Sequence, residues 1–63
     1  MITKSFLIYD DTDIYEITHV GVSIITIYCF DSVLQKQTKI HFIDLPENVQ
    51  DQVTILINGE SNE

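Results

Sequence analysis

The residue types that could form a nucleophile and its base are one cysteine and two histidines. Cys29 stands between His19 and His41 along the chain. A reactive cysteine needs an electropositive, partly exposed setting that lowers its pKa, whereas Cys29 belongs to the apolar run 20–30 of an acidic chain. A free cysteine in such a run behaves as a small hydrophobic residue. The pattern predicts a core thiol, and either histidine is expected on a sheet surface.

A short acidic group could hold a cation. It consists of Asp10, Asp11, Asp13 and Glu16. The group lacks the glycine-containing loop and the spaced ligands of an EF-hand, and the histidines and cysteine lack zinc spacing. Phosphate-binding glycine loops and the Gly-x-Ser-x-Gly pattern are also missing from the sequence. We therefore expect no catalytic residue, no metal and no cofactor, and a protein that is not an enzyme.

The charge balance narrows the possible partners. Ten Asp and Glu residues oppose three lysines, which gives a net charge of −7 and a pI of about 4.3. Nucleic-acid binding by counterion release needs clustered Lys and Arg, and anionic membranes are disfavoured for the same reason. Two interpretations stay open: the charge keeps a small protein dispersed, or it presents a row of carboxylates, as a DNA mimic, to a basic nucleic-acid-binding protein.

The elements that must position these residues are mostly strands. The run 20–30 is rich in β-branched residues, and its side chains are mostly apolar on both sides of the strand. This pattern is typical of a central strand covered on both faces. Gly21 interrupts the pattern, either as a tight turn, which we favour, or as a bulge in one long strand. Strands are predicted over about 2–9, 13–20, 22–30 and 37–44.

A helix is predicted over about 45–58. Asp44 and Glu47 match a capping box, and Pro46 suits a first turn. The alternative is a last strand over 53–57, because that stretch is rich in β-branched residues. The apolar stripe of this helix is Val49, Val53, Leu56 and Ile57. Asn58 and Gly59 are expected to end the helix, and the tail 60–63 is expected to fray.

Together these elements predict a single domain over residues 1–63. The fold class is α+β: a small two-layer antiparallel sheet of three or four strands, arranged as a meander, with one C-terminal helix packed on one face. If Tyr9 opposes Ile14, the helix-side layer is Phe6, Ile8, Tyr15, Ile17, Ile25, Ile27, Ile40 and Phe42. The other face then carries Leu7, Tyr9, Glu16, Ile24, Tyr28, Phe30, His41 and Ile43, and the chain has nothing left to cover it.

An uncovered apolar face predicts a protein partner. The expected anchors are Tyr9, Tyr28 and Phe30, with Asp10, Asp11, Asp13 and Glu16 steering the protein toward a basic target. In size, acidity and lack of catalytic groups the chain is similar to small phage-encoded inhibitors, such as anti-CRISPR proteins and uracil-DNA glycosylase inhibitors. This similarity is one of composition, and it implies a small protein-binding inhibitor or adaptor.

The alternative function is a self-associating, homodimeric structural or regulatory subunit without a DNA-mimic role. A chain of 63 residues is marginal without help, and a partner subunit is one source of help. One cysteine excludes an internal disulfide, no signal peptide is recognised, and the run 20–30 is too short to span a membrane. The expected location is the cytosol of a bacterium or of an infected cell.

Overall fold

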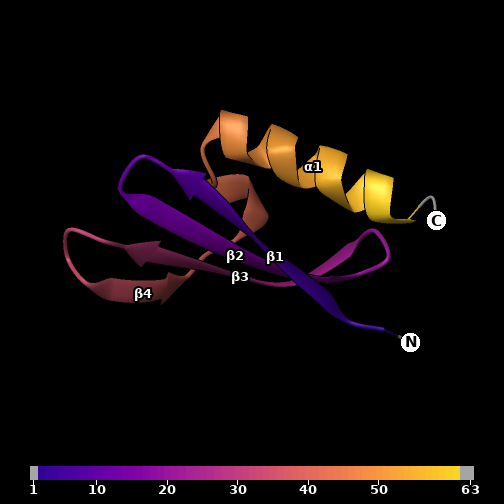
Figure 1. Cartoon of the computed structure of the whole chain (residues 1–63), viewed down its shortest axis with the longest axis horizontal. Coiled ribbons are helices and arrows are strands. Elements are labelled where there is room, and N and C mark those ends of the chain that lie inside the picture. The colour runs from indigo at the N-terminus through magenta and orange to yellow at the C-terminus, as the bar shows by residue number, and fades with distance from the viewer. Residues whose placement is uncertain (1, 62–63) are drawn as a thin grey trace.

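The computed structural model describes residues 2–61, which form a four-stranded antiparallel sheet and a C-terminal helix (Figure 1). The sheet order follows the chain, β1-β2-β3-β4, so the strands form a meander. The predicted α+β fold class is confirmed. The elements are β1 (Lys4–Asp10), β2 (Asp13–Val20), β3 (Ser23–Asp31), β4 (Lys36–Lys39), the short 3-10 helix η1 (Phe42–Asp44) and α1 (Glu47–Ser61).

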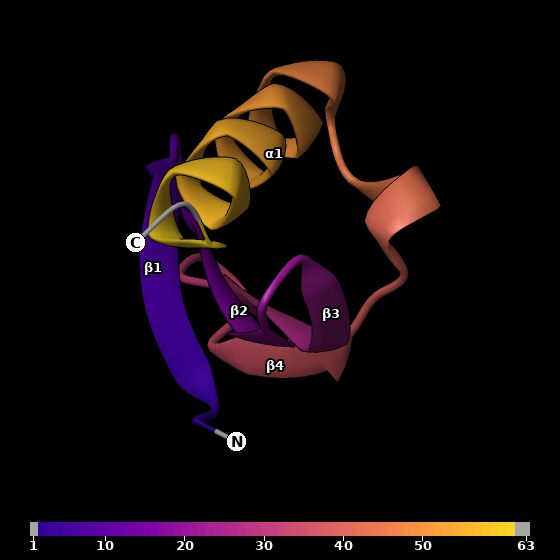
Figure 2. The same ribbon diagram turned by 90° about the vertical axis from the view of Figure 1, so that its right-hand side faces the viewer.

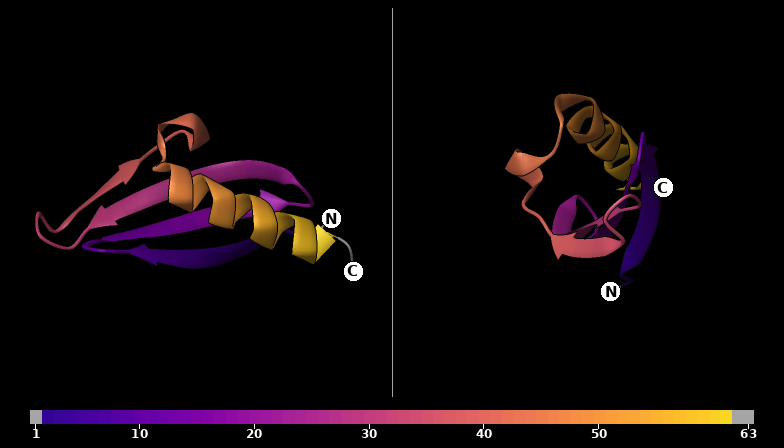
Figure 3. Two further views of the ribbon diagram at one scale, coloured as in Figure 1. Left: turned by 90° about the horizontal axis from the view of Figure 1, so that it is seen from above. Right: turned by 90° about the vertical axis from the view of Figure 1, so that its left-hand side faces the viewer.

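The helix and the sheet make two layers. Seen end-on in Figure 2, the sheet curves and α1 lies along its inner side. The view from above in Figure 3 shows α1 running along the sheet, with β1 forming one border. One face of the sheet is therefore covered by the helix and the other is not.

Both tight hairpins use a residue with a positive φ. Asp10 pairs directly with Asp13, so the first loop is only Asp11-Thr12, and Asp11 has a φ of 55°. The second loop places Gly21 at a φ of 59°, a conformation that glycine adopts without steric cost. Gly21 is thus a turn residue, as favoured from the sequence.

A bulge follows that turn and changes which side chains face the helix. The register of β2 against β3 shifts after Thr18, which pairs with Thr26, because His19 pairs with Ile24 and leaves Ile25 as the extra residue. An extra residue resets the alternation of a strand. Ile24 therefore packs against the core and Ile25 is exposed, the reverse of the predicted assignment.

The fourth strand is shorter than the predicted 37–44. It ends at Lys39, and the Ile40 N–H donates the last bond, to the Ile27 carbonyl at 2.9 Å. The chain then leaves the sheet through η1 and rises to the helix layer (Figure 2). Because the chain leaves the sheet here, Leu45 lies on the helix side of the sheet, where it is buried.

The helix boundaries also differ from the prediction of 45–58. The Pro46 carbonyl accepts from Val49 and Gln50, both at 3.0 Å, so α1 begins at Glu47, and Asp44 lies in η1 rather than capping the helix. At the other end α1 continues through Gly59 to residue 61. Part of the tail expected to fray is therefore helical, and residues 62 and 63 lie outside the described part. Within residues 2–61, no helix has the length and apolar character needed to cross a membrane.

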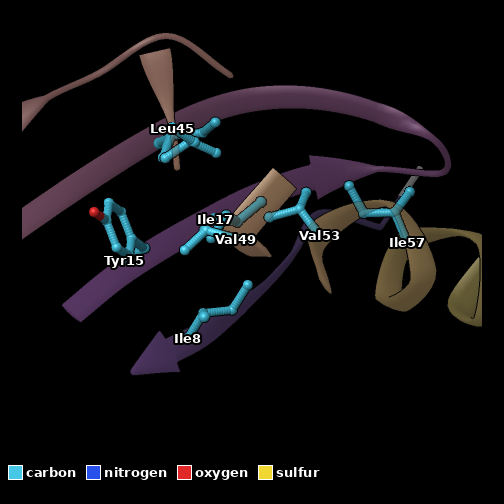
Figure 4. Close-up of a cluster of buried hydrophobic side chains, with 8 residues drawn as sticks. Ile8, Tyr15, Ile17, Leu45, Val49, Val53 and Ile57 are labelled. Atoms are coloured by element: carbon cyan, nitrogen blue, oxygen red, sulfur yellow. The ribbon is translucent and has the colours of Figure 1, made fainter. Parts of the chain in front are cut away.

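The core forms where the helix stripe meets the inner side of β1, β2 and β3 (Figure 4). Spacing of four residues places Val49, Val53 and Ile57 on one line of α1, and all three are buried. Leu56, predicted in the stripe, is 43% exposed because it lies beside that line. The buried cluster is Ile8, Tyr15, Ile17, Ile27, Leu45, Val49, Val53 and Ile57, with Phe6, Ile24, Cys29, Ile40 and Phe42 packed against it.

Candidate partner-binding surface

The sheet face opposite α1 carries two rows of side chains that run across the strands. Directly opposite residues share a face. The strand register gives one row as Leu7, Glu16, Tyr28 and Lys39 and the next as Tyr9, Ile14, Phe30 and Gln37. We call these eight residues the open face.

The open face is mostly apolar and accessible. Tyr9 is 70% exposed and Leu7 is 50% exposed, whereas Ile14, Tyr28 and Phe30 are half-buried. Ile14, Tyr28 and Phe30 are half-buried because side chains on the neighbouring strands lie directly beside them. Aromatic side chains beside aliphatic ones are typical of surfaces that bind protein, because they bring large areas at low entropy cost.

Four of the seven predicted site residues lie together on this face: Tyr9, Glu16, Tyr28 and Phe30. Glu16 separates Leu7 from Tyr28 in its row. Four members of the face were not predicted as site residues: Leu7, Ile14, Gln37 and Lys39. The alternation of the strands carried a signal for them, but only the pairing register places them in rows with the aromatic side chains.

The other acidic residues do not lie on the open face. Asp10, Asp13 and Asp31 are register partners on successive strands, and Lys36 of β4 completes that row. The row lies on the helix side at one end of the sheet: Asn48 of α1 donates to Asp10 Oδ1 at 3.3 Å. We call Asp10, Asp11, Asp13 and Asp31 the acidic end.

The acidic end is held by one hydrogen bond between its two loops and by two more within the β3–β4 loop. The Ser32 N–H donates to the Thr12 carbonyl at 2.9 Å, which joins the β1–β2 loop to the β3–β4 loop at one end of the molecule (Figure 1). Asp31 Oδ1 accepts from the N–H groups of Val33 and Leu34, at 2.9 and 3.1 Å. The carboxylates are therefore displayed on an ordered pair of turns that adjoins the open face.

Cys29 is a half-buried core thiol opposite Tyr15. Burial raises the pKa of the Cys29 thiol, and the nearby Asp13 carboxylate raises it further. Burial also raises the pKa of Tyr15 to about 12, with Cys29 and Asp13 adding to the effect. Both groups stay protonated at neutral pH, so this pair offers no nucleophile.

His19 is buried, which corrects the expectation of a surface histidine. Its Nδ1 donates to the Gly21 carbonyl at 2.8 Å, since a carbonyl oxygen can only accept. Its Nε2 has no hydrogen-bond partner among the described residues, and its ring meets Phe6 edge-on with centroids 5.6 Å apart.

The three residues that could have formed a nucleophilic site are not brought together. Cys29 pairs with Tyr15, four strand positions from His19, a separation of about 13 Å. His41 lies exposed beyond the end of β4.

Two grooves lie beside β3. One, of about 200 Å³, lies between α1 and the β2–β3 hairpin and is lined by Val22, Ile24, Phe42, Val53, Thr54, Ile57 and Asn58. The other, of about 290 Å³, lies between β3 and the segment after β4. Across residues 2–61, no group of three or more His, Cys, Asp or Glu side chains is arranged to hold a metal ion.

Comparisons of the chain with protein-family models, with curated proteins and with solved structures find no match. What the protein does is therefore inferred from its own surfaces.

Proposed function

We propose that this protein is a non-catalytic binding protein that docks its open face on a basic, nucleic-acid-handling protein and acts as an inhibitor or adaptor. The observation that carries the proposal is the open face itself. It joins three aromatic and two aliphatic side chains on a side of the sheet that α1 leaves uncovered. Contiguous exposed apolar surface of this kind marks interaction sites.

The aromatic residues supply the anchors. Tyr28 and Phe30 lie on β3, a central strand, and Tyr9 lies on β1, separated from Phe30 in the same row by Ile14 of β2. Residues near the middle of an interface carry most of its binding energy, and Tyr is prominent among them. We assign Tyr28 and Phe30 as the central anchors and Tyr9 as a flanking contact.

The acidic end supplies the steering. A net charge of −7 favours encounter with a basic partner. Because the row Asp10, Asp13 and Asp31 lies on the helix side, the partner meets these carboxylates around the end of the sheet rather than across the open face. A basic groove beside an apolar patch fits this arrangement. In the cytosol of a bacterium or of an infected cell, Cys29 would stay a free thiol.

The test starts from a basic protein that the immobilised chain retains from a cell lysate. That protein is purified, and its binding is measured over a salt series with four forms: wild type, Tyr28→Ala, the double variant Asp11→Asn/Asp13→Asn, and the control Ile43→Ala. Ile43 is 83% exposed and lies in η1, away from the open face.

The expected results separate the two parts of the surface. Tyr28→Ala should weaken binding at least 10-fold at every salt concentration, because the loss of an interface anchor raises the dissociation rate. The double Asn variant should slow association mainly at low salt, since long-range steering is screened by ions. Ile43→Ala should match wild type. A retained protein that binds all four forms alike would reject the open face as the docking surface.

The alternative of a homodimer through the open face is judged by the same variants. In that case Tyr28→Ala would abolish self-association that salt does not disturb, and the double Asn variant would have no effect on it.

A further inference from the structure

The outer edge of β1 is an unprotected sheet edge. β1 is the first strand in the sheet order, and no backbone hydrogen bond to the outer side of its residues 5–9 is found within residues 2–61. Its interior, residues 5–9, has no charge, no proline and no bulge. Natural edge strands usually carry such features, because an open edge is a template for another strand.

The opposite edge of the sheet differs in this respect. β4 has only four residues and bears a lysine at each end, Lys36 and Lys39. Short strands and lysines are the common means of blocking an edge. The contrast singles out β1, which has seven residues, as the edge able to accept a strand.

The backbone pattern fixes which groups β1 offers. A two-residue hairpin is closed by a hydrogen-bonded pair, here Asp10 with Asp13, and such pairs alternate along an antiparallel ladder. Ile8 and Phe6 therefore bond inward to β2, and the backbone N–H and C=O groups of Ser5, Leu7 and Tyr9 point outward.

We propose that two copies of the chain pair antiparallel through β1 about a twofold axis at Leu7, forming one eight-stranded sheet. Leu7 then faces Leu7 of the other copy, and Ser5 faces Tyr9, so all three outward positions exchange hydrogen bonds. The same register places Lys4 opposite Asp10, a pair of opposite charges at each end of the interface.

The side chains along the edge agree with this axis. Leu7 is 50% exposed on the open face and would be covered by its own counterpart. On the helix side, Asn48, Gln52 and Leu56 follow at a spacing of four and form one flank of α1. Asn48 reaches Asp10, so this flank faces β1, and Leu56 is 43% exposed on it. The two helices would thus present Leu56 toward the axis.

The charge distribution favours the antiparallel arrangement. The acidic end lies at the C-terminal end of β1. Antiparallel pairing sends the two acidic ends to opposite tips of the dimer, whereas parallel pairing would place them side by side. Apart from Leu7, the dimer leaves the open face of each copy uncovered and makes it continuous across the axis, so it is compatible with the proposed function and does not rest on it.

The first test is the molar mass of the full chain by light scattering over a dilution series. Wild type should move from twice 7.3 kDa to 7.3 kDa as it is diluted. Leu7→Pro removes the outward N–H without breaking a bond to β2, and proline is tolerated at such edge positions. It should remain folded by circular dichroism and be a monomer at every concentration, whereas Leu7→Thr, which keeps the N–H, should still dimerise.

The second test determines how the two β1 strands align, and it does not require the Leu7→Pro variant to fold. In a Cys29→Ser background, Leu7→Cys should form an intermolecular disulfide under mild oxidation, because a hydrogen-bonded cross-strand pair has a Cα separation of about 5.5 Å. Tyr9→Cys is the matched control, since two copies of residue 9 would be about 13 Å apart along the strands. Lys4→Glu and Asp10→Lys should each weaken the dimer, and together they should restore it.

A wild type that stays monomeric at the highest concentration would overturn the proposal, as would a Leu7→Pro dimer or equal cross-linking at residues 7 and 9. If Tyr28→Ala rather than Leu7→Pro abolishes the dimer, the copies meet through the open face instead. Partner binding by a monomeric chain would leave the proposed function standing while this inference fails.

Discussion

Asp13 of β2 and Asp31 of β3 are direct register partners, so two carboxylates stand side by side at the end of the sheet. Asp13 is also the register partner of Asp10 on β1. Like charges that lie directly opposite are destabilising in a sheet. The opposition of these carboxylates therefore costs stability in the free protein, even though Asp31 also accepts two hydrogen bonds within its turn.

Asp13→Asn should raise the thermal stability of the protein. Removing one of the three adjacent charges relieves about 0.2–1 kcal/mol, which corresponds to a few degrees in the melting temperature of a domain of this size. The gain should shrink as salt is added, because ions screen exposed charges. Thermal melts at low and high salt measure both effects, with Asp44→Asn, in η1, as the control that should change little. A melting temperature that falls in Asp13→Asn would show that the carboxylate stabilises the turn.

The two glycines should respond to alanine in opposite directions. An added Cβ would meet no atom within 4 Å at either position, so the backbone alone decides. Gly21 has a φ of 59°, where a side chain costs roughly 1–2 kcal/mol, and Gly21→Ala should destabilise. Gly59 lies within α1, where alanine is favoured by up to about 1 kcal/mol, and Gly59→Ala should stabilise. Chemical denaturation of both variants against wild type gives the two signs, and equal signs would contradict the turn at Gly21.

Stability should fall at alkaline pH, with Tyr15 as a main cause. Burial raises the pKa of Tyr15 to about 12, from 10.0, and it also raises the pKa of Cys29. Because the folded-state pKa values are raised, the unfolded chain loses these protons at a lower pH than the folded protein does. The contribution of these groups to the free energy of unfolding is therefore fully present below about pH 9–10 and is lost as the pH rises toward 12. Melting temperatures between pH 7 and pH 12 should show this decline, and Tyr15→Phe should reduce it. Tyr9→Phe, which removes an exposed hydroxyl, is the control; an unchanged decline in Tyr15→Phe would exclude Tyr15 as the cause.

Much of the fold was predictable from local patterns. The assignment of the two sheet faces started from the assumption that Tyr9 opposes Ile14, and the structure has that register. The same reasoning placed Ile8, Tyr15 and Ile17 beneath the helix, where they are buried. These predictions succeed because a hairpin with a short loop fixes its own register.

The wrong predictions arise where one extra residue shifts the alternation of side chains between the two faces of a strand. The bulge at Ile25 exchanges the faces of Ile24 and Ile25, and a bulge depends on tertiary pairing that alternation does not reveal. The same limit applies to β4, whose end at Lys39 is set by the path of the chain to the helix layer.

The acidic residues show the same effect at the candidate site. The pairing of Asp10 with Asp13 sends both to the helix side, whereas Glu16 faces outward with Tyr28. The number of acidic residues predicted an acidic surface. Only the strand register shows that Glu16 lies on the open face and that Asp10 and Asp13 lie at the acidic end.

The accessibility of the three tyrosines tests the central claim most directly. Tyr9 and Tyr28 lie on the open face, and Tyr15 is 3% exposed beneath the helix. Their ring signals in a nuclear magnetic resonance spectrum, assigned by Tyr→Phe variants, are followed as a soluble nitroxide is added. The structure predicts strong broadening of Tyr9 and Tyr28 and little of Tyr15. Protection of Tyr28 equal to that of Tyr15 would mean that the open face is already covered, and the proposed docking surface would be wrong.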